Sequence, residues 1–89
     1  MRQELEKILK DELRFLAIST RNHLNLTQKE MENRLQMSES SYSDIETGKS
    51  MCGTLTAFLL LDMQNDPTNF IQRTMIKFAE CYEKEMQTI

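Results

Sequence analysis

Residues 27–48 read TQKEMENRLQMSESSYSDIETG, and this stretch decides the fold that we predict for the chain. Thr27 and Glu30 have the spacing of a capping box, in which the hydroxyl accepts from the Glu30 amide and the carboxylate reaches back. Ser38 offers a second N-cap, and Gly48 is the residue type that ends helices in a left-handed conformation. The stretch therefore predicts two short helices joined by a tight turn.

The apolar residues of this stretch predict which faces of the two helices are buried. Met31 and Leu35 are four residues apart, the spacing of a buried helical stripe. Tyr42 and Ile45 occupy the inner face that we expect for the second helix. Two helices separated by a three-residue break and followed by glycine indicate a helix-turn-helix.

The stretch resembles the helix-turn-helix of the lambda-repressor/Cro type, often called the XRE family. Thr27-Gln28 opens the first helix as in that family, Ser38 opens the second, and Ile45-Glu46-Thr47-Gly48-Lys49 matches the closing I-E-x-G-K. The resemblance implies an all-α fold: a five-helix lambda-repressor-like DNA-binding domain with a long C-terminal helix.

Three positions differ from the usual family pattern. Glu32 stands where the family usually has alanine, so its carboxylate must point outward or the two helices must open slightly. Gln36 and Asn25 stand where the family often has glycine. We expect the left-handed conformation at both positions, and asparagine tolerates it well.

Three further helices are expected around the motif. The first spans residues 3–21, with an apolar stripe of Leu5, Ile8, Leu9, Leu13, Leu16 and Ala17. The part of the stripe that extends beyond the motif, Leu5, Ile8 and Leu9, either packs on the C-terminal helix or makes a dimer contact. The fourth spans residues 55–63, is apolar on nearly every face, and belongs either to the core or to a subunit interface. Asn65-Asp66-Pro67 predicts the start of a fifth helix over 67–86. We expect residues 1–89 to form a single helical domain.

Composition and charge limit the classes of function that the chain can have. The net charge is −3 and no basic patch is visible along the chain, which predicts weak non-specific attraction to phosphate. Cys52 and Cys81 are far apart and lack the spacing of a metal site, and two unpaired thiols fit a reducing cytoplasm. No membrane span, catalytic constellation or cofactor motif is visible. We therefore expect a cytoplasmic protein that is not an enzyme and has no cofactor.

The resemblance implies a DNA-binding surface. Gln28 would bond a DNA phosphate, and the second motif helix would enter the major groove with its first turn facing the bases. The residues implied in DNA binding are Gln28, Ser38, Glu39, Ser40, Ser41, Ser43, Asp44 and Lys49. Arg21 would either serve the phosphate backbone or be solvated.

Two functions from different classes follow. The first is a sequence-specific transcriptional regulator that binds double-stranded operator DNA as a homodimer through residues 38–47. The predicted dimer contacts are Phe70, Met75, Phe78 and Tyr82, on the apolar stripe of the fifth helix. The alternative is a helix-turn-helix reused as a protein-interaction module with a basic or apolar protein partner.

Overall fold

The computed structural model describes residues 1–64 and 66–87. The helices are α1 (Arg2–His23), α2 (Gln28–Leu35), α3 (Glu39–Thr47), α4 (Thr54–Met63) and α5 (Pro67–Gln87). The predicted all-α fold with a long C-terminal helix is confirmed. Asn65 of the predicted helix boundary, and residues 88–89 of the predicted domain, lie outside the described residues. Within the described chain, no helix combines the length and the hydropathy that a membrane span requires.

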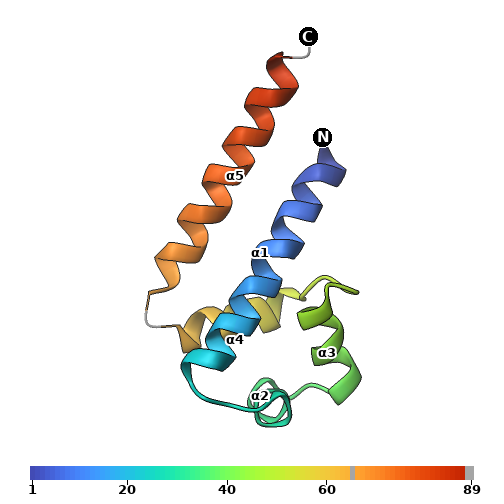
Figure 1. Cartoon of the computed structure of the whole chain (residues 1–89), viewed down its shortest axis with the longest axis vertical. Helices are drawn as coiled ribbons and strands as arrows, with labels where there is room; N and C mark the ends of the chain where they lie inside the picture. The colour runs from blue at the N-terminus through green and yellow to red at the C-terminus, as the bar shows by residue number, and fades with distance from the viewer. Residues whose placement is uncertain (65, 88–89) are drawn as a thin grey trace.

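Two long helices project from a base of three short ones. Figure 1 shows α1 and α5 running antiparallel, with the start of α1 and the end of α5 at the same end of the molecule, while α2, α3 and α4 gather around the opposite end of α1. The molecule measures 47 × 26 × 18 Å. Helix α1 contacts α3, α4 and α5, so it is the element that joins the motif to the C-terminal helix.

The hydrophobic core lies in the base and draws on the first four helices. It is built from Leu13, Leu16, Ala17, Met31, Leu35, Tyr42, Ile45, Cys52 and Leu60. The four positions predicted to be buried within the motif are all in this core. Helix α5 adds the half-buried Phe70 at its first turns, and α4 buries only Leu60 fully. Much of the apolar surface of α4 and α5 therefore faces outward.

The predicted helix ends are confirmed by their hydrogen bonds. The Glu30 amide donates to Thr27 Oγ1 at 3.1 Å, and the Thr27 amide donates to Glu30 Oε1 at 3.0 Å. The Ser41 amide donates to the hydroxyl of Ser38 at the start of α3. Gly48 ends α3 with a φ of 80°, a conformation that glycine adopts without steric cost.

A buried carboxylate joins α5 to α1. Glu12 of α1 is only 2% exposed, and its Oε1 lies 2.5 Å from Lys77 Nζ while its Oε2 lies 3.5 Å from Arg73 Nε. The Arg73 guanidinium also stacks over the ring of Phe15, 4.5 Å from its centroid. The Arg73 and Lys77 side chains keep 40% and 47% of their surface exposed while their charged groups reach Glu12. The acidic side chain that attracts them could not be paired with them from sequence spacing.

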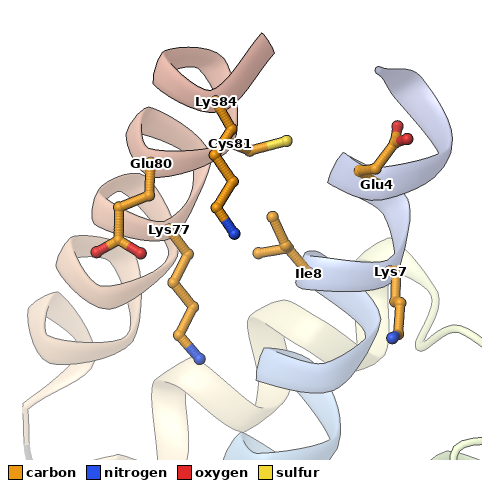
Figure 2. A pocket seen from close by; sticks show the side chains of 7 residues that line it. All are labelled: Glu4, Lys7, Ile8, Lys77, Glu80, Cys81 and Lys84. Carbon is orange, nitrogen blue, oxygen red and sulfur yellow. The ribbon is translucent and has the colours of Figure 1, made fainter. Parts of the chain in front are cut away.

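Farther from the base, α1 and α5 border an open groove of about 370 Å³. Figure 2 shows Ile8 of α1 and the thiol of Cys81 directed into the space between the helices, with the Lys84 ammonium beside Ile8. Leu9, the next residue of α1, packs against the core of its own chain. The side-chain contacts that join α1 to α5 lie nearer the base, at Glu12 and Phe15.

Candidate nucleic-acid interface

The turn between α2 and α3 sets the angle at which α3 is presented. Gln36 adopts the left-handed conformation with φ 55° and ψ 46°, as predicted, and Asn25 before the motif does so with φ 56°. The Met37 amide donates to the Glu32 carbonyl at 3.0 Å, which closes the end of α2. A non-glycine residue in this conformation costs about 1 kcal/mol, which a packed motif can offset.

Glu32 does not behave as expected for an outward-pointing residue. Only 7% of its surface is exposed, so the position that is usually alanine in the family is buried here. The methylenes of a glutamate side chain can pack where its carboxylate could not.

Helix α3 buries one face in the core and leaves other residues accessible to solvent. Tyr42 is fully buried and Ile45 is 4% exposed. Of the other residues of α3, Glu39, Ser40 and Ser41 are exposed, and Ser43 and Asp44 are half-buried. These are the residues predicted to face DNA. The inner face was predicted correctly, because two buried residues at helical spacing fix the rotation of the helix. The DNA contacts implied by the resemblance stay a prediction.

Residues from both motif helices line one depression. Gln28 at the start of α2 and four residues at the start of α3 border a hollow of about 570 Å³: Ser38, Glu39, Ser40 and Ser43. The Ser38 hydroxyl also donates to Ser41 Oγ at 2.7 Å, so these two hydroxyls cap the helix as well as facing outward. Lys49 lies apart from this hollow, at the other end of α3.

A buried carboxylate fixes α3 against α1 and α2. Glu46 accepts from Arg21 through two bonds, Nε to Oε2 at 2.7 Å and Nη2 to Oε1 at 3.2 Å. It also accepts from Gln28 Nε2 at 3.1 Å and from the hydroxyl of Tyr42. The Arg14 side chain adds a bond of 2.6 Å from its Nε to the Glu46 carbonyl.

The charges of this network follow from its geometry. Burial by itself would raise the pKa of Glu46, but the hydrogen bonds from Arg21 and Tyr42 outweigh it and lower that pKa. Burial, and then the hydrogen bond to Glu46, raise the pKa of Tyr42. Glu46 is therefore ionised and Tyr42 is neutral at physiological pH.

Arg21 was expected either to contact the phosphate backbone or to be solvated, and both expectations are wrong. It is neither solvated nor free for a phosphate, because its guanidinium binds Glu46 and also donates to the Leu26 carbonyl at 3.2 Å. From the sequence, Glu46 was assigned only as part of the closing I-E-x-G-K match, and its hydrogen-bond partners were not predicted. A buried acid needs such partners, but the Arg21–Glu46 separation of 25 residues gives no local signal of the pair.

Comparison with known families bears on this geometry. Residues 19–62, about half of the chain, match the helix-turn-helix family model, which is of the lambda-repressor/Cro-like XRE type. Residues 19–62 belong to the helix-turn-helix family. Searches of curated proteins and of solved structures returned no match.

The helix-turn-helix match covers the end of α1, all of α2 and α3, and most of α4. It supports a role in DNA binding and transcription regulation, and the family is one of non-enzymatic DNA-binding domains. Most of α1 and all of α5 lie outside the matched residues.

The four residues predicted for a dimer interface differ in their surroundings. Phe70 packs against the core of its own chain, and Phe78 is half-buried. Met75 and Tyr82 are 62% and 47% exposed. Exposed apolar side chains also lie on α4, where Leu55 and Phe58 are neighbours on one face.

Proposed function

We propose that this helix-turn-helix protein is a sequence-specific transcriptional regulator that binds operator DNA as a homodimer, with α3 in the major groove. The observation that carries the proposal is the hollow shared by Gln28 and the first turn of α3. One phosphate-positioning group and several base-reading groups then lie on a single surface, as a docked recognition helix requires.

The bond between Gln28 and Glu46 supports this role for Gln28. A glutamine amide has two N–H donors, and the bond to Glu46 uses only one of them. The second donor is therefore free to bond a phosphate oxygen from an oriented side chain. An oriented donor loses less entropy on binding than a mobile one.

The outward residues of α3 limit which bases can be read. Serine hydroxyls such as that of Ser40 can donate to or accept from a base edge, whereas Glu39 and Asp44 can only accept, for example from the amino group of cytosine. This surface favours selectivity over strong attraction, because carboxylates repel the phosphates on either side of the groove.

The apolar stripe of α5 supports the homodimer. Ile71, Met75, Phe78 and Tyr82 recur at steps of four, three and four residues, the spacing that packs one helix against a second copy. Three of them, Ile71, Met75 and Tyr82, are exposed in the single chain. A symmetric pair would present two α3 helices to two half-sites.

Selection of bound sequences from a random duplex pool at low salt tests the whole proposal. We expect enrichment of a two-fold symmetric sequence whose half-sites are about 34 Å apart, one turn of DNA, or a multiple of that distance. A pool that stays random after repeated rounds, with folded protein, would contradict it.

A second function is favoured by the exposed apolar residues of α4. Leu55 and Phe58 are 73% and 67% exposed, and the outward face of α3 is partly acidic. Such surfaces suit a protein partner that is apolar or basic.

The variant Glu39→Gln with Asp44→Asn separates the two functions. If α3 enters the groove, removing like charges near phosphates raises non-specific DNA affinity at low salt while leaving the shape unchanged. If the protein is an interaction module, DNA affinity stays negligible and binding to a basic partner is lost. Titration against random duplex at two salt concentrations measures the difference.

A further inference from the structure

A stripe of basic side chains runs along the face of α1 that meets α3. At 3.6 residues per turn, the positions 7, 10, 14 and 21 point in directions that fall within about 60° of one another. They are occupied by Lys7, Lys10, Arg14 and Arg21. The two arginines, nearer the end of α1, hold α3 through the Glu46 carbonyl and carboxylate.

The two lysines of this stripe, Lys7 and Lys10, lie beside the loop that follows the end of α3. Helix α3 stops at Thr47, and the amide of Lys49 then donates to the Asp44 carbonyl at 2.8 Å, which fixes the start of the following loop. Lys7 and Lys10 of α1 meet this loop across a pocket of about 330 Å³, whose lining also includes Gln3, Lys49 and Ser50.

Lysine side chains outnumber acidic ones in the lining of this pocket, by Lys7, Lys10 and Lys49 to Glu6. Among the residues that the structure describes, none of Lys7, Lys10 and Lys49 forms an ion pair, in contrast to Lys77 with its bond to Glu12. The one acidic side chain of the lining, Glu6, is 3.3 Å from the guanidinium of Arg2. The pocket is thus a local concentration of positive charge in a protein of net charge −3.

We propose that Lys7, Lys10 and Lys49 form a second anchor for DNA backbone phosphates, beside the C-terminal end of α3. The inference rests on the proposed DNA-binding function and extends it to α1, most of which lies outside the family match. Lysine ammonium groups bind phosphate as mobile point charges and release condensed counterions when they do so. The Gln3 amide and the Ser50 hydroxyl supply neutral donors in the same pocket.

This anchor explains how an acidic α3 can be held against DNA. The outward face of α3 carries Glu39 and Asp44, so the attraction to the backbone has to come from another part of the surface. The lysine pocket follows α3 directly in the chain and is contributed by two elements that are packed together. Gln28 at one end of the motif and the lysine pocket at the other would then bind phosphates on either side of the inserted helix.

Salt-dependent binding of single variants tests the anchor. The full chain, Lys7→Gln, Lys10→Gln and the matched control Lys84→Gln are titrated into a fluorescent random-sequence duplex over a series of salt concentrations. Lys84 is an exposed lysine near the end of α5, so the control has the same change in net charge. We expect Lys7→Gln and Lys10→Gln each to reduce the slope of log K against log salt by about 0.9, one phosphate contact, and Lys84→Gln to leave it unchanged.

The outcomes separate this inference from the function on which it rests. If the unmodified chain binds no duplex even at the lowest salt, the DNA-binding function fails and the anchor fails with it. If the chain binds duplex but Lys7→Gln and Lys10→Gln match Lys84→Gln, only the anchor is overturned. A parallel titration with inorganic tripolyphosphate identifies the source of the phosphate. Loss of its binding in Lys10→Gln with unchanged duplex binding would assign the pocket to a free polyphosphate and overturn the DNA assignment.

Discussion

The Arg21 guanidinium and the Glu46 carboxylate form a bidentate ion pair, with N–O distances of 2.7 and 3.2 Å, that joins α1 to α3. Glu46 is 6% exposed, and its carboxylate also accepts a hydrogen bond from the Gln28 side chain. One buried acid therefore connects the scaffold helix, the proposed groove-binding helix and the residue proposed to hold a phosphate. The rigid presentation of α3 depends on that carboxylate being ionised and fully bonded.

Arg21→Ala is expected to destabilise the protein by about 3 kcal/mol, because it leaves a buried carboxylate without its cation. Urea unfolding followed by circular dichroism measures the change. Arg34→Ala, at an exposed arginine of α2, is the control and should change stability by less than about 0.5 kcal/mol. Equal midpoints for the two variants would contradict a structural role for the pair.

The same pair predicts how stability responds to acid. The pKa of Glu46 is lower in the folded protein than its ordinary value of 4.5, so the folded state favours the ionised form. Its contribution to stability is complete above the unfolded pKa and is lost as the pH falls through the lower folded pKa. Glu46→Gln should therefore flatten the fall of unfolding free energy below about pH 4.5. Urea titrations from neutral pH into that acid range would show an unchanged fall if the prediction is wrong.

Glu12→Gln is expected to loosen α5 while leaving the motif folded. The substitution keeps the shape but removes the charge that attracts Lys77 and Arg73, at a cost of about 1.5 to 3 kcal/mol. Hydrogen exchange should accelerate in α5 and stay slow in α2 and α3. Glu80→Gln, an exposed glutamate of α5, is the matched control. Uniformly faster exchange throughout the chain would show instead that α5 and the motif unfold together.

Gln28→Ala and Ser40→Ala should affect DNA binding in different ways. Loss of a phosphate contact weakens binding by a similar factor on every sequence, because the backbone carries no base identity. Loss of a base contact changes preference at one base pair, by about 1 to 3 kcal/mol. Binding of each variant to the selected sequence and to its single-base variants measures both effects. Unchanged binding by two folded variants would exclude this surface as the DNA-binding one.

Met75→Glu tests the predicted dimer through α5. The side chain is 62% exposed and lies on the stripe with Ile71 and Tyr82, so a carboxylate there would be buried unpaired between two copies. We expect light scattering at micromolar concentration to report a dimer for the unmodified chain and a monomer for this variant. Ile76→Glu, at the next residue with 58% exposure but off the stripe, should remain dimeric. A monomeric unmodified chain would refute the prediction.

The local features of this protein could be determined from the sequence because they depend on residues a few positions apart. Thr27 and Glu30 cap each other across one turn, Gly48 ends α3 by its own backbone freedom, and Met31 and Leu35 define one buried face by helical spacing. The left-handed conformation at Gln36 and Asn25 was predicted from the family resemblance. The inner face of α3 was predicted from the helical spacing of Tyr42 and Ile45.

The pairings of charged residues were decided only by the tertiary structure. Arg21 with Glu46, and Glu12 with Lys77, are too distant in the chain for periodicity to join them, since any exposed acid could serve as well until packing brings two groups together. The positions of Lys7 and Lys10 on the stripe of Arg14 and Arg21 were readable from helical spacing. Their meeting with Lys49 required the fold, because it depends on where α3 ends against α1. Charge counted along the chain showed no basic patch, whereas packing two segments side by side created one.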